Sequence, residues 1–179
     1  NAVFGFLNIM LKIIDSKQPD YMAVAFDVHQ PTFRHEMFKD YKGTRKPMME
    51  ELREQVPVIK ELLQKMNITT VELPGYEADD VIGTLSKKGE KAGMEVDVIS
   101  GDRDLLQLAS DHITICIPKT KKGQTTVEEY NTEGVMKLYK VTPTEFIDVK
   151  ALMGDSSDNI PGVPGIGEKG ATAIISQFG

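Results

Sequence analysis

Gly154-Asp155-Ser156-Ser157-Asp158-Asn159 is followed directly by Ile160-Pro161-Gly162-Val163-Pro164-Gly165-Ile166-Gly167-Glu168-Lys169-Gly170. The first part of this stretch offers two carboxylates, Asp155 and Asp158, at the spacing of one helical turn. The second part is a glycine-rich hairpin that leads into a predicted helix over residues 168–178. Paired acids suit a metal ion, and a glycine-rich loop before a helix suits a phosphate. Together they indicate a protein that holds a nucleic-acid backbone beside bound cations.

The hairpin has features that favour contact with phosphate. Gly162, Gly165 and Gly167 have no side chains, so another molecule can come close to their backbone. The helix that begins near Glu168 presents free backbone N–H groups, and Lys169 adds a positive charge. The simpler interpretation is an ordinary glycine-rich turn. The spacing Gly-Val-Pro-Gly-Ile-Gly-Glu-Lys favours the phosphate-binding interpretation.

Three further acidic clusters lie where a predicted strand ends or a predicted helix begins. Asp27 follows the apolar residues 23–26, Glu77-Ala78-Asp79-Asp80 opens a helix, and Gly101-Asp102-Arg103-Asp104 follows a strand. Taken singly, each acid has a simpler explanation as a turn residue, a helix cap or a first-turn acid favoured by the helix dipole.

Taken together, the four clusters favour divalent cations with oxygen ligands, such as Mg²⁺. Two such ions about 4 Å apart can hold the attacking water and the leaving oxygen of a phosphodiester. The three histidines are scattered along the chain, so the sequence offers no zinc pattern. The predicted metal ligands are Asp27, Glu77, Asp79, Asp80, Asp102, Asp104, Asp155 and Asp158.

A basic segment supplies the counterpart of these acids. Residues 29–47 show no long periodicity and predict an exposed, partly helical excursion. Within it, Tyr41 is placed to stack on a base or a terminal nucleotide. Lys42 and Arg45 are three residues apart and can reach one phosphate. The alternative is a solvated basic loop without a function.

Composition and charge bound the class of protein. The chain has 179 residues, 40% of them hydrophobic, which is enough for one compact domain with or without a small appendage. The net charge of −6 argues against a DNA partner, but leaving out the eight proposed metal ligands leaves 19 acids against 21 bases. The acidity is therefore concentrated where cations would neutralise it.

The single cysteine and the apolar runs bear on the compartment. Cys116 lies in an apolar strand, which favours a buried thiol over a nucleophile and a reducing, cytoplasmic compartment. No apolar run approaches the roughly 20 residues of a membrane span, so we expect no membrane partner.

Strands and helices alternate over the first two thirds of the chain. The patterns predict strands at 21–26, 69–73, 95–100 and 112–118, with helices at 2–15, 49–66 (broken or kinked at Pro57), 77–92 and 103–109. A basic turn over 119–124 returns through 125–128. Helices then follow at 131–139, at 143–153 with Thr142 as its cap, and at 168–178. This order predicts a parallel α/β domain followed by a small helical element that faces DNA.

The motifs, taken in order, resemble a known family. They are Phe26-Asp27, Tyr41-Lys42-Gly43-Thr44-Arg45, Glu77-Ala78-Asp79-Asp80, Gly101-Asp102-Arg103-Asp104, Gly154–Asn159 and Pro161–Lys169. Together they are similar to the 5′-nuclease domain of bacterial DNA polymerase I, in the flap endonuclease superfamily. The resemblance implies a PIN-like, mostly parallel sheet flanked by helices, with a basic helical arch at about 29–50 and a C-terminal helix–hairpin–helix element. It divides the chain into a catalytic domain, 1–140, and a DNA-binding element, 141–179.

The same resemblance implies an activity and roles for single residues. The activity is Mg²⁺- or Mn²⁺-dependent cleavage of 5′ flaps and RNA primers on branched duplex DNA, in replication and repair. Lys42 and Arg45 correspond to the arch cations at the scissile phosphate, and Lys150 and Lys169 to duplex-binding cations. The backbone from Gly165 to Gly167 corresponds to a K⁺ site that bridges to a DNA phosphate. We expect a monomer, and a polymerase domain in the parent chain is left open.

One departure from the family leaves an alternative open. The family has an Asp at the end of a first strand, and this chain begins after that point. A strand and a metal ligand are therefore expected to be missing, with an effect on activity or stability. The alternative function is a fragment that binds branched DNA without cutting it. A PIN-type ribonuclease is a weaker alternative, because such domains usually lack the Gly-Ile-Gly hairpin.

Overall fold

The structure is a computed structural model that describes residues 2–121 and 124–179. It divides into two compact units, each described by itself. Unit 1 comprises the chain up to Thr32 together with Lys46–Val81, and unit 2 comprises Phe33–Arg45 together with Ile82–Gly179. Lys122 and Gly123, in the predicted basic turn, lie outside the described residues. None of the helices in the described ranges has the length and apolar character needed to cross a membrane.

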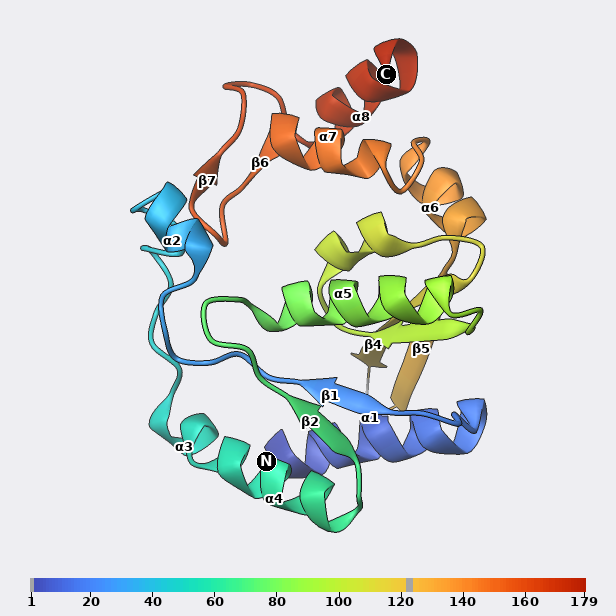
Figure 1. The fold of residues 1–179 in the computed structure, drawn as a ribbon. Helices are drawn as coiled ribbons and strands as arrows, with labels where there is room; N and C mark the ends of the chain where they lie inside the picture. Colours follow the sequence, from blue (N-terminus) through green and yellow to red (C-terminus); the bar gives the residue numbers. More distant parts are fainter. Residues whose placement is uncertain (1, 122–123) are drawn as a thin grey trace. The chain divides into compact units, whose positions relative to one another are not determined.

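Unit 1 is a pair of parallel strands packed with helices (Figure 1). Strand β1 pairs with β2 in parallel, with Ala23 opposite Thr69. Met10 from α1 and Ile59 and Leu63 from α4 form the buried core, as their helical spacing predicts. The elements are α1 (Ala2–Lys17), β1 (Ala23–Ala25), α3 (Glu50–Arg53), α4 (Gln55–Lys65) and β2 (Thr69–Val71).

The helix predicted over 49–66 is divided, but not at the proline. The division falls at Glu54, between α3 and α4. Pro57 is the third residue of α4. In the first turn of a helix the backbone N–H has no partner within the helix, so a proline is tolerated there. The prediction of a break was right and its assignment to Pro57 was wrong.

Unit 2 holds the second group of strands and the C-terminal helices. Strand β3 is parallel to β4, with Val96 opposite Ile113, and β4 is antiparallel to β5. Helix α5 (Ala78–Lys91) begins at the end of unit 1 and lies mostly in unit 2. The other elements are α2 (Phe33–Met37), β3 (Val96–Ile99), the 3-10 helix η1 (Arg103–Leu108), β4 (Ile113–Lys121), β5 (Gln124–Tyr130), α6 (Thr132–Tyr139), α7 (Glu145–Met153), β6 (Gly154–Asp155), β7 (Ile160–Pro161) and α8 (Glu168–Phe178).

The α/β class and the parallel strand pairs are confirmed. The hydrogen-bonded strands form separate sheets of two, three and two strands, where the sequence predicted one sheet. Strand β4 is longer than predicted because it pairs with β5 as far as Lys121, opposite Gln124. Cys116 is fully buried in β4, which confirms the prediction of a buried thiol.

One apolar core extends through unit 2 from the sheet to the C-terminal helices. Leu106 and Val135 come from the first 140 residues, and Val149 and Ala171 come from the last 39. All four side chains are fully buried. The helical element that follows residue 140 is therefore packed as part of unit 2, and the functional division at 140 stays a proposal.

Helix α7 begins with the predicted cap. The Thr142 N–H donates to Glu145 Oε2 at 2.7 Å, and the Glu145 N–H donates to Thr142 Oγ1 at 3.2 Å. These reciprocal bonds form a capping box. The bonds from Thr142 hold the pKa of the Glu145 carboxyl below its ordinary value. This cap fixes the start of the helix that leads to the acidic stretch.

The acidic stretch Gly154–Asn159 belongs to a β-hairpin formed by β6 and β7, and it is not helical. Strand β6 pairs with the antiparallel β7, with Gly154 opposite Pro161, and a turn over 156–159 joins them. The backbone is very crowded there. A Cβ on Gly162 would lie 2.3 Å from the carbonyl carbon of Met153, and Gly154 has a φ of +70°. Only glycines fit at both positions, so they fix the path of the hairpin.

Gly162→Ala should therefore destabilise the protein by about 3 kcal/mol, since its methyl group would overlap a neighbouring backbone. Gly170→Ala in α8 is the matched control, because its Cβ would make an ordinary contact at 3.6 Å with Ile166. That change should raise stability by about 0.5 kcal/mol through helix propensity. Urea unfolding followed by circular dichroism measures both values. Equal effects of the two substitutions would contradict the packing described here.

Candidate metal and nucleic-acid site

The eight predicted metal ligands are divided equally between the two units. In unit 1, Asp27 lies just after β1, and its Oδ1 accepts the N–H of Ala78 at 2.7 Å. Asp80 Oδ2 accepts the N–H of Glu77 at 2.9 Å. Both carboxylates therefore lie at the N-terminus of α5, where the helix dipole favours negative charge. Glu77 and Asp79 come from the same few residues and are half-buried.

In unit 2, the cluster after β3 forms a helix cap. Asp102 is the N-cap of η1, and its Oδ1 accepts the N–H of Asp104 at 2.8 Å. This is the simpler role that the sequence left open for Asp102. Asp104 has a different environment, because its side chain reaches Lys150.

Lys150 lies between two of the predicted metal ligands. Its Nζ is 2.9 Å from Asp104 Oδ1 and 2.9 Å from Asp155 Oδ2. The family resemblance predicted that Lys150 is a duplex-binding cation, whereas in the structure its ammonium group contacts two carboxylates. It does so because Lys150 lies on α7, one turn before Asp155, and α7 packs against η1.

The pKa values of these groups are shifted by burial and by their mutual bonds. Burial raises the pKa of the Asp104 carboxyl, and the bond from Lys150 only partly offsets this effect. Burial alone would also raise the pKa of Asp155, but hydrogen bonds from Ser157 and Lys150 outweigh it and lower the pKa far below its ordinary value. Burial alone would lower the pKa of Lys150, but its two acidic partners raise it. Asp155 is therefore the stronger acid of the pair.

Asp158 binds the basic segment instead of facing Lys150. Its Oδ1 pairs with Arg45 Nη2, and its Oδ2 accepts the Tyr41 hydroxyl at 3.0 Å. The N–H of Lys42 donates to the Asp158 carbonyl oxygen at 2.8 Å. Figure 1 shows α2 and the residues after it beside the β6–β7 loop. The structure thus brings Arg45 and Asp158 together, where the sequence assigned one to a phosphate and the other to a metal.

The sequence predicted that Tyr41 lies on an exposed surface, and this prediction was wrong. Its side chain is only 5% exposed, and its ring meets the edge of His35 at 5.1 Å between centroids. Lys42 Nζ lies 5.1 Å from the centre of the Tyr41 ring. The segment turns sharply here, with the Gly43 N–H bonded to the Asp40 carbonyl oxygen and a φ of +55° at Lys42. The turn directs Tyr41 inward and makes it an anchor of the segment.

The open backbone predicted for the glycine-rich stretch before α8 is present at Gly165 and Gly167, whereas the prediction was wrong for Gly162, which is crowded by the backbone of Met153 and Gly154. Gly165 has a φ of +82°, and no atom lies within 4 Å of where its Cβ would be. Gly167 is the N-cap of α8 and has no side chain to satisfy the first N–H groups. Lys169 is exposed in the first turn of that helix. Gly165, Gly167 and Lys169 present open backbone and a positive charge on one short segment.

Two residues near the acids were missed by the sequence analysis. Ser157 Oγ donates to Asp155 Oδ1 at 2.7 Å and lies 3.4 Å from Asp158 Oδ1. Asn159 Nδ2 donates to the Asp40 carbonyl oxygen at 2.7 Å. The signal for Ser157 was its place two residues after an Asp, because Asp side chains often accept bonds from that position. The signal for Asn159 was its tolerance of positive φ, which is +59° here.

The acids of unit 2 fit a hard cation in pairs. Among residues 2–121 and 124–179, no three His, Cys, Asp or Glu side chains form a ready group of metal ligands. However, Asp104 and Asp155 share one cationic nitrogen at 2.9 Å, and Ser157 joins Asp155 to Asp158. Each of these two carboxylates therefore has an oxygen in contact with the same positive charge. The oxygen donor set is the one that Mg²⁺ and Mn²⁺ prefer.

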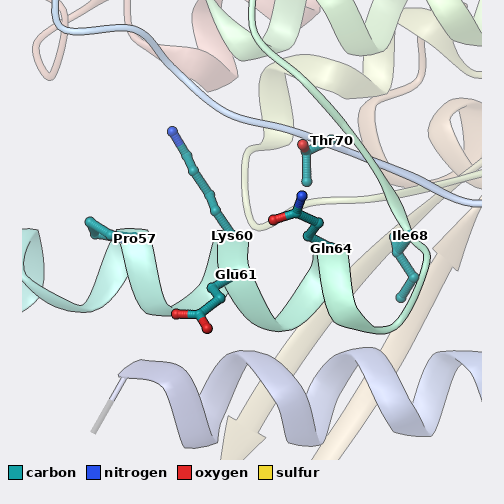
Figure 2. A pocket seen from close by; sticks show the side chains of 6 residues that line it. All are labelled: Pro57, Lys60, Glu61, Gln64, Ile68 and Thr70. Atoms are coloured by element: carbon teal, nitrogen blue, oxygen red, sulfur yellow. The ribbon is translucent and has the colours of Figure 1, made fainter.

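Two surface hollows lie on the described part of the chain, one in each unit. One, of about 530 Å³, lies in unit 1 along α4 and contains none of the predicted residues (Figure 2). Its Lys60 pairs with Glu72 and lies 5.0 Å from the centre of the Phe26 ring, so its charge is already satisfied. The other, also of about 530 Å³, lies in unit 2 between the basic segment and the β6–β7 loop. Only the second hollow adjoins the predicted site.

Comparisons with known proteins identify the family. A model described as "5'-3' exonuclease, N-terminal resolvase-like domain" matches residues 1–140, and one described as "5'-3' exonuclease, C-terminal SAM fold" matches residues 141–179. The DNA polymerase I of Bacillus caldotenax is 54% identical over 179 residues, covering 100% of this chain and 20% of that protein. The chain therefore belongs to the 5′-3′ exonuclease family, and the resemblance predicted from its motifs is confirmed.

Solved structures agree with this assignment. A T5 5′-exonuclease with bound zinc is 28% identical, with a TM-score of 0.77, over 99% of this chain and 67% of that one. A bacteriophage T5 flap endonuclease in a complex with DNA and metal ions is also 28% identical, with a TM-score of 0.78 over the same shares. The chain spans about one fifth of the length of the curated DNA polymerase I relatives, 20% in each of the first two.

Asp155 should make the stability of the protein depend on pH. Its pKa is lowered in the folded state, so its bonds stabilise the fold fully above the unfolded pKa of about 4, and this effect is lost gradually as the pH falls from there through the lowered pKa of the folded state. Asp155→Asn should therefore cost about 2 kcal/mol at pH 7 and less at pH 3, where the unfolded carboxyl is already protonated. Urea unfolding in EDTA at both pH values measures the difference. Asp148→Asn, an exposed acid on the same α7 helix region, is the control and should change little at either pH.

Proposed function

We propose that this chain is the nuclease part of a larger enzyme and hydrolyses phosphodiesters at 5′ ends, 5′ flaps and RNA primers during DNA replication and repair. The observation that carries the proposal is the match of residues 1–140 and 141–179 to the two 5′-3′ exonuclease domains, together with the grouping of Asp104, Asp155 and Asp158 in unit 2. Acids arranged around cations suit metal-assisted phosphoryl chemistry. The T5 relatives with metal ions and DNA support the same reaction and the same partners.

The proposed cofactor is Mg²⁺ or Mn²⁺, in two or more ions. Asp104, Asp155 and Asp158 would hold a cation in unit 2, together with Asp102. The motif resemblance extends the proposal to the acids of unit 1, which are Asp27, Glu77, Asp79 and Asp80. Such a cation lowers the pKa of bound water and neutralises charge on the phosphate.

The cations of the chain would position the substrate. Lys42 and Arg45 would bind the scissile phosphate and stabilise its developing negative charge. Lys150 would contact the duplex when it is not between its two carboxylates. Lys169 and the free N–H groups at the start of α8 would hold a duplex phosphate further away. A K⁺ ion at the backbone of Gly165 to Gly167 remains part of the proposal.

Specificity would follow from the shape of a branched duplex, because contacts to phosphates carry no sequence information. Tyr41 would contribute by anchoring the basic segment, since its ring is buried. A fused polymerase domain is consistent with the length of the curated relatives, and a monomer in the cytoplasm remains the expectation.

A second candidate is a module that binds branched DNA without cutting it. The pairing of Lys150 and Arg45 with carboxylates favours it, because carboxylates that already have cationic partners bind metal less readily. Incubation with a labelled 5′-flap duplex distinguishes the two. Product formation supports the nuclease, and retention without product supports the binding module.

The nuclease should cut a labelled 5′-flap duplex in Mg²⁺ and stop when EDTA removes the metal. Asp155→Asn should lower the single-turnover rate by about 100-fold or more while DNA affinity changes little, because the carboxylate acts through a cation. Asp148→Asn is the control for loss of one surface acid and should cut at the normal rate. Equal rates for the two variants would contradict the assignment of Asp155 as a metal ligand.

Lys169 should affect DNA binding in a sequence-independent way. Lys169→Ala should weaken binding to flap duplexes of different sequence equally. It should also reduce the slope of log affinity against log salt by about 1, since one phosphate contact is lost. Fluorescence anisotropy in EDTA between 50 and 200 mM salt, roughly the range over which such effects are resolved, measures both. Lys137→Ala on α6 is the charge-matched control, and the same loss in both variants would contradict a specific contact.

A further inference from the structure

We propose that Arg45 and Asp158 form a latch, which holds the segment Phe33–Arg45 on the β6–β7 loop until a divalent cation takes Asp158. Release of the latch would free Arg45 to bind a phosphate. Asp158 would thus exchange the guanidinium of Arg45 for a metal ion. Arg45 would exchange the carboxylate of Asp158 for a phosphate. The inference rests on the proposed function in one respect, namely that Asp158 is a cation ligand.

Three contacts of Asp158 lead to this one segment. Its Oδ1 pairs with Arg45, its Oδ2 accepts the Tyr41 hydroxyl at 3.0 Å, and its backbone oxygen accepts the Lys42 N–H at 2.8 Å. The Arg45 Nε also donates to the carbonyl oxygen of Ser157 at 3.1 Å. Both carboxylate oxygens of a predicted metal ligand are therefore engaged by residues of a segment more than 110 positions earlier in the chain.

The segment is buried at the latch and exposed further from it. Tyr41 is 5% exposed, whereas Met37, four residues earlier, is 81% exposed. Beyond Asp158, the loop makes a further bond to the segment from Asn159 Nδ2 to the Asp40 carbonyl oxygen. The hollow of about 530 Å³ between the two parts shows that they are not tightly packed around these bonds. The contacts described here that join the segment to the loop are hydrogen bonds and the ion pair of Arg45 with Asp158.

The exposure of Arg45 allows the latch to open. The Arg45 side chain is 49% exposed, and an ion pair with such a partner is weak in water. A divalent cation at Asp158 would repel the guanidinium of Arg45. It would also be attracted by the neighbouring carboxylate of Asp155. The two arrangements therefore exclude each other. Cation binding would thereby make the phosphate-binding arginine available.

The first test measures binding of Mn²⁺ alone, by electron paramagnetic resonance and without DNA. Arg45→Gln removes the competing guanidinium and should bind Mn²⁺ about 5-fold more tightly than the unchanged protein. Lys39→Gln is the matched control, because it removes one positive charge from the same exposed segment and should change the affinity by less than about 2-fold. Equal affinity in Arg45→Gln and the unchanged protein would overturn the latch.

The second test follows the segment itself by limited trypsin digestion. Mn²⁺ should accelerate cleavage after Lys42 and Arg45 in the unchanged protein, with a midpoint that matches the Mn²⁺ affinity. Asn159→Gly removes the supporting bond to Asp40 and keeps the positive φ, so it should speed cleavage even in EDTA. Cleavage that is independent of Mn²⁺ in the unchanged protein would overturn the latch. Circular dichroism checks that each variant is folded.

Asp158→Asn separates this inference from the proposed function. Weakened Mn²⁺ binding by Asp158→Asn, together with tighter binding by Arg45→Gln, supports both. If Asp158→Asn binds Mn²⁺ normally, the metal role of Asp158 is wrong and the latch fails with it. If Asp158→Asn loses Mn²⁺ while Arg45→Gln leaves both affinity and trypsin cleavage unchanged, only the latch fails.

Discussion

The ammonium group of Lys150 lies 2.9 Å from a carboxylate oxygen on each side, and the charge balance of the acids around it depends on this contact. Without a positive charge between them, the carboxylates of Asp104 and Asp155 would repel each other, because both lie close to the same nitrogen. The lysine can reach both because α7 packs against η1, with Val149 and Leu106 in one buried core. Apolar packing therefore sets the geometry in which the charges balance.

The backbone at Gly154 and Gly162 has the second decisive role. Neither position has room for a Cβ, so the chain leaves α7 along a single path and returns through β7. The turn between them directs Asp155 toward Lys150 and Asp158 toward Arg45. Two acids three residues apart thereby serve two different cations.

Much of the fold could be predicted from the sequence because the relevant forces are local. The helix over Glu168–Phe178, the cap at Thr142 and the buried strand around Cys116 follow from periodicity, hydrogen-bonding capacity and hydrophobicity. The predicted helical spacing of Asp155 and Asp158 was wrong, because the spacing of two acids does not reveal a hairpin. The exposure predicted for Tyr41 was also wrong, because its partner is 117 residues away.

The sequence by itself determined the family, the α/β class and the set of acids and bases from which the candidate site is built, because motif order and residue chemistry do not depend on three-dimensional contact. Only the tertiary structure decided which charge meets which. Lys150 binds two acids and Arg45 binds Asp158 because packing and glycine turns bring those groups within reach. Electrostatic energy depends on the distance between charges, and a distance between residues so far apart in the chain is a property of the fold.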